Sequence, residues 1–557
     1  MNILPIAMKI RGKLIFAPHL EKFSKNPTST QSELLLKIVK ENQDTAFGKD
    51  HNFSEIHSIA DFQKNVPIQE YKDLLPYVER HKKGEKHVLT MEEPAIYALT
   101  SGSTGKPKYI PITPSFIKEY SNISTLWLYN ILRDHPHVYD GDIFAVMPPP
   151  TSEKTAGGTP LGTISGYIQK NLPSFVLSHY VVDEEYLRGV TGHDDLYYIW
   201  MRLGMEADVT LMIIINPATH LLLAKKGNEW CEDILKDIEE GTLKKDVKIP
   251  AKTRQLIESK LQPNPKRAAE LRKIYKKNGC LYPKDYWPNL AVSVCWKSGS
   301  MATFLPQLPQ YYGEVAVRDL GLSATEARIC TPLQDEGAHG VLTVDNNFFE
   351  FIPEEHLGEE NPPVVLTDEL KIDHNYSVIV TPLNGLYRYN LNDIIRVVGY
   401  YNKTPLVEFI HKGKGYSSLT GEKLSEWQIM RAVHDCSREL DLPIDIFLAY
   451  GDTAEPQHYV FCVGFKHKPN EGKQQLFLDT VDEKLQKFNI EYKKRRGTGR
   501  LGAPEMQLID GLKIQETYHQ IKLSQGFHDS QMKFPALITD YNNHDFEELK
   551  KNGMVKH

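Results

Sequence analysis

The chain has 557 residues, 41% of them hydrophobic and 25% charged, which is the composition of an ordinary globular protein with roughly two to four domains. Its formal net charge of −6 argues against a general nucleic-acid or membrane-surface binder, since such proteins usually carry a basic balance or patch. The six cysteines follow no C-x-x-C spacing and no window of about 18 apolar residues occurs, so we expect a cytoplasmic chain with reduced thiols.

The first 90 residues are polar and amphipathic, which predicts a helical lead-in. Within them, T-Q-S-E-L-L-L-K-I-V-K-E-N at 30–42 has the apolar spacing of a helix that follows a Ser/Thr cap. The run A-I-Y-A-L at 95–99 then predicts a short buried strand.

The next segment is the loop T-S-G-S-T-G-K-P-K at 100–108, which combines four hydroxyl side chains, two glycines and two lysines. Glycines let the backbone approach a ligand, hydroxyls donate hydrogen bonds, and lysines supply countercharge, as phosphates require. It is not a Walker loop, because two residues separate Gly102 from Gly105 and a proline follows Lys106. A solvated turn is about as common for such a cluster. The trailing K-P-K favours a nucleotide-binding loop.

Strand-like and helical stretches alternate from Tyr97 to about Phe409, which predicts an α/β domain. The clearest examples are strands at 143–147, 209–215 and 376–381 and a helix at Glu229–Glu239. Residues 244–288 are rich in Lys, Pro and Arg and predict an exposed helical insert. The glycine- and lysine-rich segment around His411 predicts a hinge between an N-terminal domain, 1–411, and a C-terminal domain, 412–557.

Three later clusters have residue types suited to a nucleotide. S-G-S-M-A-T-F-L-P at 298–306 and L-S-A-T-E at 322–326 combine a glycine turn with a carboxylate, which could hold a nucleobase edge and Mg²⁺. The plainer interpretation of the cluster alone is that Glu326 caps or flanks a helix. In G-L-Y-R-Y-N-L-N-D-I-I-R-V at 385–397, Asp393 opens an apolar strand and could accept ribose hydroxyls, or else form an ion pair with Arg396 or Arg388. The third is S-Q-M-K-F-P at 530–535, whose lysine is most simply a surface residue.

The order and spacing of these clusters resemble the core motifs of the adenylate-forming superfamily of acyl-AMP synthetases. Within it, the chain is most similar to the plant auxin-responsive-promoter family of acyl-acid amido synthetases, which also has bacterial members. This closer resemblance rests on S-G-S-M-A-T-F-L-P, N-F-F-E-F-I-P at 347–353, G-L-Y-R-Y, D-I-I-R-V-V-G-Y-Y-N-K-T-P at 393–405 and Q-M-K-F-P. It runs from about residue 30 to the end of the chain.

The resemblance implies an α/β fold with a large N-terminal domain of α/β subdomains plus a β-barrel, and a smaller mobile α+β C-terminal domain. It also implies that a carboxylic acid reacts with ATP and Mg²⁺ to give acyl-AMP and pyrophosphate, and that an amino acid amine then forms an amide. Small-molecule acids and amino acids are the expected partners of a monomeric chain, without nucleic acid or membrane.

Site residues follow from the matching motifs, position by position. The resemblance implies that phosphates are held by Thr100, Ser101, Gly102, Ser103, Thr104 and Lys108, and the base by Gly299, Ser300, Leu322, Ser323 and Thr325. It implies that Glu326 binds Mg²⁺, that Asp393 with its neighbour Arg396 binds the ribose side of the nucleotide, and that Lys533 reaches the α-phosphate and the substrate carboxylate as a catalytic residue.

Two departures from the family pattern concern specificity. Leu322 stands where superfamily members often carry an aromatic residue that stacks on adenine, and the loop lacks the glutamate and arginine that plant members place before its final lysine. An acyl-CoA ligase of the phenylacetate-activating type is therefore an alternative, and a non-catalytic nucleotide-binding scaffold is a third hypothesis. Tyr120, Trp127 and Ile214 could line an acyl pocket, but such residues more often belong to the core.

Overall fold

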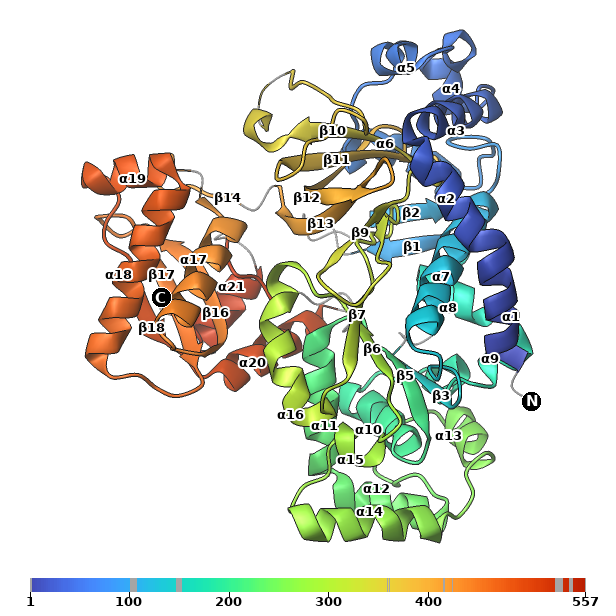
Figure 1. The fold of residues 1–557 in the computed structure, drawn as a ribbon, viewed down its shortest axis with the longest axis vertical. Coiled ribbons are helices and arrows are strands. Elements are labelled where there is room, and N and C mark those ends of the chain that lie inside the picture. Colours follow the sequence, from blue (N-terminus) through green and yellow to red (C-terminus); the bar gives the residue numbers. More distant parts are fainter. Residues whose placement is uncertain are drawn as a thin grey trace. The chain divides into compact units, whose positions relative to one another are not determined.

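The computed structural model describes residues 3–555 with gaps at 101–107, 147–152, 358, 360, 414–415, 423, 526–533 and 540–543. The chain forms two compact units, each described by itself below (Figure 1). The larger unit comprises residues 1–297, 307–391 and 395–409, and the smaller unit comprises 298–306, 392–394 and 410–557. Among the helices described, none is both long and apolar enough to cross a bilayer.

The larger unit begins with the predicted helical lead-in: α1 (Ile3–Arg11), η1 (Gly12–Phe16), α2 (Ala17–Lys25), α3 (Pro27–Glu41), α4 (Ala46–Asp50), η2 (Phe53–Glu55), α5 (Ile59–Asn65) and α6 (Tyr71–Lys82). α3 confirms the helix predicted at 30–42, and it starts earlier because Pro27 occupies its first turn, where a missing N–H costs nothing. The buried Gln31 amide fixes α3 to β10 (Asn347–Pro353), since it donates to Asn347 O (2.7 Å) and accepts from Phe349 N (2.7 Å).

Two sheets of the larger unit contain parallel strands. The first has the order β2 (Lys108–Ile112), β1 (Ile96–Thr100), β4 (Leu161–Gly162), with β1 antiparallel to β2 and parallel to β4. The second is fully parallel, in the order β3 (Asp142–Ala145), β5 (Val209–Ile213), β6 (Val292–Cys295), β7 (Ala316–Asp319). Ile143 and Ala145 pack with Trp127 of α7 (Pro114–Asp134), while Phe144 faces Gly204 on the opposite side, so helices cover both faces of this sheet.

The helices around the parallel sheet include the predicted insert. They are α8 (Ile164–Lys170), α9 (Ser174–Leu177), η3 (Glu184–Leu187), α10 (His193–Gly204), α11 (Pro217–Glu229), α12 (Cys231–Glu240), α13 (Ala251–Glu258), α14 (Pro265–Asn278), α15 (Pro283–Tyr286) and α16 (Leu308–Tyr312). The insert at 244–288 is helical, as predicted, but the expectation that it is simply exposed is wrong: Ala268 and Leu271 of α14 are buried, and Arg272 pairs with Glu239 of α12 (2.6 Å).

The larger unit also contains a six-stranded sheet. Its order is β10, β11 (Asn375–Pro382), β12 (Tyr389–Tyr401), β13 (Thr404–Lys412), β9 (His339–Leu342), β8 (Cys330–Thr331). The pairs β10–β11, β13–β9 and β8–β9 are antiparallel, and η5 (Glu354–His356) follows β10. One core joins this sheet to the helical lead-in and to β1 and β2 (Figure 1). β12 thereby brings motif residues from late in the chain to the first strands.

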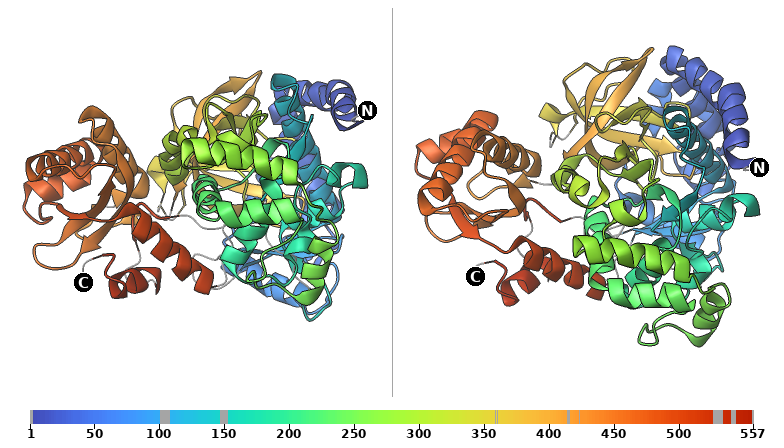
Figure 2. Two further views of the ribbon diagram at one scale, coloured as in Figure 1. Left: turned by 90° about the horizontal axis from the view of Figure 1, so that it is seen from below. Right: turned by 60° about the horizontal axis from the view of Figure 1, so that its bottom comes forward.

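The smaller unit is an α+β structure with its own core (Figure 2). Its elements are η4 (Gly299–Gln307), β14 (Tyr416–Ser417), β15 (Leu424–Ser425), α17 (Glu426–Glu439), β16 (Ile444–Asp452), β17 (His458–Phe465), α18 (Glu471–Phe488), α19 (Ile490–Gly497), β18 (Glu505–Leu508), α20 (Gly511–Ser524) and α21 (His544–Lys551). β17 lies between an antiparallel β16 and a parallel β18. Alternate residues of β16 and β17 pack towards α17 and α18 or towards α20 and α21, so helices cover both sheet faces. The six cysteines of the chain are free thiols.

Candidate functional site

The predicted phosphate loop joins the two strands of a hairpin. β1 ends at Thr100 and β2 begins at Lys108, and these residues pair across the antiparallel ladder. The strand predicted at 95–99 is therefore confirmed. The other predicted loop residues lie outside the described part of the chain: Ser101, Gly102, Ser103 and Thr104.

Lys108, Tyr389 and Glu326 meet in the larger unit. The Lys108 ammonium donates to the Tyr389 hydroxyl (3.1 Å), and this hydroxyl donates to Glu326 Oε1 (3.4 Å). The three side chains come from β2, from the start of β12 and from the segment after β7, so the fold assembles them from distant parts of the sequence. A cation and a carboxylate thus flank one phenol. This is the pairing that a triphosphate and its metal ion require, because the metal is held by a few carboxylates together with phosphate oxygens.

Two tyrosines surround the Lys108 ammonium, and the sequence analysis identified neither as a site residue. Its Nζ lies 5.5 Å from the ring centre of Tyr71 and 5.8 Å from that of Tyr389, within cation–π range. Burial raises the pKa of Tyr71 to about 12, while burial and then the charge of Glu326 raise the pKa of Tyr389 far above its ordinary value. Both phenols are therefore neutral at physiological pH and remain hydrogen-bond donors. The motif G-L-Y-R-Y was the available signal for Tyr389.

The predicted base-lining segment before Glu326 is a tight turn. Ala324 N donates to Ala327 O (2.9 Å), Ile329 N donates to Leu322 O (2.8 Å), and the Ser323 hydroxyl lies 3.2 Å from the Tyr120 hydroxyl. The segment with Leu322, Ser323 and Thr325 is half-buried, and Glu326 does not flank a helix. The buried Asn384 amide donates to Glu326 O (3.4 Å), which fixes the backbone that carries the carboxylate.

Asp393 is buried within β12, so the expectation that it opens a strand is wrong: β12 already begins at Tyr389. Its carboxylate forms an ion pair with Lys412 of the neighbouring strand β13. Arg388, one of the two predicted partners, binds Glu350 instead, through Nε and Nη2 (both 2.9 Å). The other, Arg396, stands three positions along β12, and side chains three apart in a strand point to opposite faces. Arg396 Nε donates to Asn375 Oδ1 (3.1 Å).

The remaining predicted residues are placed as follows. Gly299 has a φ of +60° and begins η4, Ser300 follows it there, and Lys533 lies outside the described residues. Of the residues considered for an acyl pocket, Trp127 and Ile214 are buried in the core, as the plainer interpretation had it.

Comparisons with known proteins match the chain almost from end to end. Family models match at residues 17–317 (GH3 family N-terminal domain), 340–412 (central domain) and 427–542 (C-terminal domain). Jasmonoyl--L-amino acid synthetase JAR6 of Nicotiana attenuata is 25% identical over 96% of this chain and 94% of its own length. Indole-3-acetic acid-amido synthetase GH3.15 of Arabidopsis thaliana is 25% identical over 94% of this chain and 92% of its own.

The solved structure of AtGH3.15 acyl acid amido synthetase in complex with 2,4-DB has the same fold, with a TM-score of 0.86 at 22% identity over 98% of this chain and 97% of that chain. The predicted α/β fold is thereby confirmed. The N-terminal family model alone spans more than half of the sequence, and GH3 is the auxin-responsive-promoter family that the motifs resemble. The chain therefore belongs to the GH3 family.

Proposed function

We propose that this protein is an acyl-acid amido synthetase that uses ATP. A carboxylate oxygen of the acid attacks the α-phosphorus of ATP, which gives acyl-AMP and releases pyrophosphate. The amine of an amino acid then attacks the acyl carbon and displaces AMP, with loss of a proton, to give the amide. The relatives are named as a jasmonoyl--L-amino acid synthetase (JAR6) and an indole-3-acetic acid-amido synthetase (GH3.15), and they are similar over nearly the whole chain.

The observation that carries this proposal is the cluster of Lys108, Glu326 and Tyr389. Adenylation needs charge neutralisation on phosphate oxygens more than it needs covalent help from the protein. The Lys108 ammonium suits the β- and γ-phosphates, and the half-buried Glu326 carboxylate suits a magnesium ion, which would neutralise the triphosphate. We extend the proposal to the ribose for the buried Asp393 and to the α-phosphate for Lys533.

A pyrophosphate-release screen over carboxylic acids tests the function, with each amino acid or coenzyme A as the acceptor. We expect release that depends on an acid, and amides rather than thioesters when products are identified by mass spectrometry. Formation of acyl-CoA alone would favour the acyl-CoA ligase instead. The relatives named above differ in their acids, and so the acid and the amino acid have to come from the screen.

A further inference from the structure

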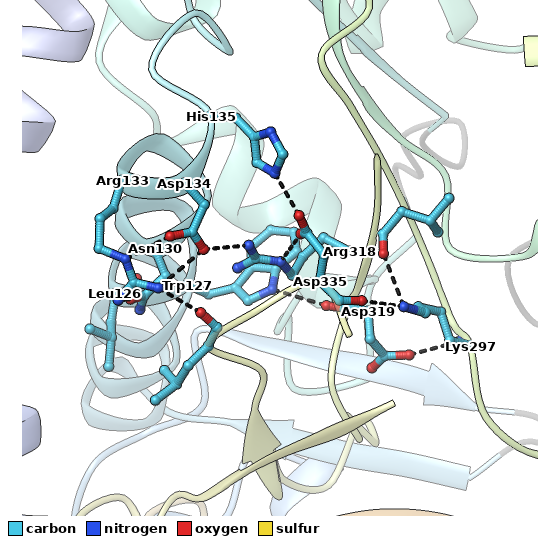
Figure 3. A network of polar contacts seen from close by, with 12 residues as sticks. Leu126, Trp127, Asn130, Arg133, Asp134, His135, Lys297, Arg318, Asp319 and Asp335 are labelled. Carbon is cyan, nitrogen blue, oxygen red and sulfur yellow. Dashed lines mark hydrogen bonds and ion pairs between the residues drawn. The ribbon is translucent and has the colours of Figure 1, made fainter. Parts of the chain in front are cut away.

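A buried polar network lies at the ends of β6 and β7 (Figure 3). In the sequence it adjoins the segments at 298–300 and 322–325, which the family resemblance implies line the adenine. It includes Arg318 and Asp319, the last residues of β7, together with Lys297, Asp335 and Asp134. Arg318 is fully buried and binds Asp335 Oδ1 (2.5 Å) and Asp134 Oδ2 (2.7 Å). Asp319 is only 3% exposed. Nothing in the proposed chemistry uses these charges directly, although burying them is costly.

The carboxylate of Asp319 accepts hydrogen bonds from two backbone N–H groups. One belongs to Lys297 (2.6 Å to Oδ2), the residue directly before Ser298 and Gly299. The other belongs to Gly321 (2.6 Å to Oδ1), the residue directly before Leu322. One side chain thus holds the residue from which each predicted base-lining segment starts.

Both N–H groups are themselves held in place. The Lys297 ammonium donates to Val317 O (3.1 Å) and to Asp335 O, so that both the backbone N–H and the side-chain end of Lys297 are fixed. Gly321 has a φ of +86°, and a Cβ added there would lie 2.5 Å from Cys330 O, so the turn tolerates no side chain. The indole of Trp127 donates to Asp319 O (3.0 Å) and fixes the backbone of the carboxylate as well (Figure 3).

We propose that Asp319 is a positioning residue for recognition of the adenine: its carboxylate fixes the residues that begin both base-lining segments. The inference rests on the proposed function. Different residues then serve the two ends of ATP. Asp319 acts on the segments that bind the base, whereas Lys108 and the loop before it bind the phosphates.

The charged state of Asp319 makes the role sensitive to pH. Burial raises the pKa of its carboxyl to about 6, although the two N–H donors and the charges of Lys297 and Arg328 favour the ionised form. The other titratable groups facing it are the thiols of Cys295 and Cys330, which burial keeps neutral because it raises their pKa. Below about pH 6 a proton competes with the N–H donors for the carboxylate oxygens. Because the pKa is raised, this group's contribution to folding improves as the pH falls, so weaker base binding just below pH 6 would not come from a loss of that contribution.

The test compares equilibrium binding of Mg²⁺-ATP to the full-length chain with that of Mg²⁺-tripolyphosphate, which lacks both the base and the ribose. In Asp319→Asn an amide NH₂ must face one of the two N–H donors. We expect this variant to bind ATP about 10-fold more weakly and tripolyphosphate within about twofold of the wild type, as for loss of one buried hydrogen bond. The control is Asp335→Asn, which disturbs Arg318 and His135 in the same network but keeps both bonds to Asp319. It should lower the melting temperature and leave both affinities within about twofold.

A second measurement on the wild type applies even if Asp319→Asn does not fold. The ratio of ATP affinity to tripolyphosphate affinity, each corrected for the ionisation of that ligand's own phosphates, should fall below about pH 6. Equal losses for both ligands in Asp319→Asn, unchanged ATP binding, or a ratio that is flat with pH would each overturn the role of Asp319. A wild-type chain that binds tripolyphosphate but not ATP would instead contradict the proposed function, and this inference with it.

Discussion

The hydroxyl of Tyr389 bridges the charged groups of Lys108 and Glu326. It is buried and neutral, it accepts from the ammonium and it donates to the carboxylate. Such a phenol can hold both charged groups in place before a ligand arrives, which lowers the cost of reorganisation during the reaction.

The first prediction concerns Tyr389→Phe. Removing the hydroxyl should lower acid-dependent exchange of pyrophosphate into ATP by roughly 10-fold, because hydrogen bonds to charged groups contribute about 1.5–3 kcal/mol. The matched control is Tyr387→Phe, which removes a hydroxyl on the same motif whose bond goes to a backbone carbonyl, Leu89 O (2.6 Å). The control should lose about 1 kcal/mol of stability and keep its exchange rate. Equal loss of exchange in both variants would mean that Tyr389 acts only through the fold.

Residue types predict local secondary structure well, but they do not predict which distant side chains bind one another. The helix at 30–42 and the strand at 95–99 were both predicted from residue types. The ion pair of Asp393 with Lys412 was not, because it depends on how β12 and β13 lie beside each other. The position of Tyr389 between Lys108 and Glu326 likewise depends on three elements that are far apart in the sequence.

Among the elements, β12 is anchored to the lead-in helices and to β10 by one buried pair. Arg388 donates to both carboxylate oxygens of Glu350, and its Nη1 donates to Val66 O (2.7 Å) and Gln63 O (3.1 Å). The side chains are 6% and 1% exposed. Since Tyr389 is the next residue, this anchor also sets the position of the site.

The second prediction is that Arg388→Met destabilises the larger unit by about 3–5 kcal/mol, because the buried Glu350 charge loses its partner. Chemical denaturation should show a lower midpoint. The double variant Arg388→Met with Glu350→Met should recover a large part of the loss, since it removes both charges. A single variant as stable as the wild type would show that the pair is not an anchor.

The third prediction concerns the turn before α17 in the smaller unit. The buried Glu422 carboxylate accepts from Leu419 N (2.8 Å), Thr420 N (2.9 Å) and the Tyr459 hydroxyl (2.5 Å). Burial alone would raise the pKa of Glu422, but these hydrogen bonds outweigh it and hold the pKa below the ordinary value of 4.5. A lowered pKa stabilises the fold above about pH 4.5, and this contribution is lost as the pH falls through the folded-state pKa.

Glu422→Gln should therefore reduce the stability of the smaller unit at pH 7 and flatten its decline below about pH 4.5, as measured by urea midpoints at several pH values. Glu483→Gln on the exposed side of α18 is the control and should follow the wild type. An unchanged acid dependence in Glu422→Gln would assign the acid sensitivity to other carboxyl groups.

Element boundaries were predicted where a cap or an apolar run marks them. α7 starts at Pro114 because the Thr113 hydroxyl accepts from Phe116 N (3.3 Å), so a Thr cap marks its beginning. The strands expected at 209–215 and 376–381 are β5 and β11. The packing of α14 was not predicted, because most of its residues are charged or polar and only two of its positions, Ala268 and Leu271, are buried.

For the whole molecule, the notable feature is that each of the two units has a core of its own. The chain segment after Lys533 is part of the smaller core: Ala449 N donates to Ala536 O (2.9 Å), and Ile538 N donates to Ala449 O (2.8 Å). Lys533 stands three residues before Ala536 in the sequence. We propose that the smaller unit uses it in only one of the two half-reactions.

The last prediction separates those half-reactions. Positive charge against the α-phosphate matters most while pyrophosphate leaves, so Lys533→Ala should lower acyl-AMP formation by roughly 10²-fold. Aminolysis of supplied acyl-AMP should change much less, because its leaving group is already AMP. Lys513→Ala, at an exposed position on α20 of the same unit, is the control and should keep both rates. Equal losses in both half-reactions of Lys533→Ala would point to damage of the smaller unit, and no loss in either would remove Lys533 from the adenylation chemistry. A selective loss would instead mean that Lys533 serves the first step and that the second step proceeds without it.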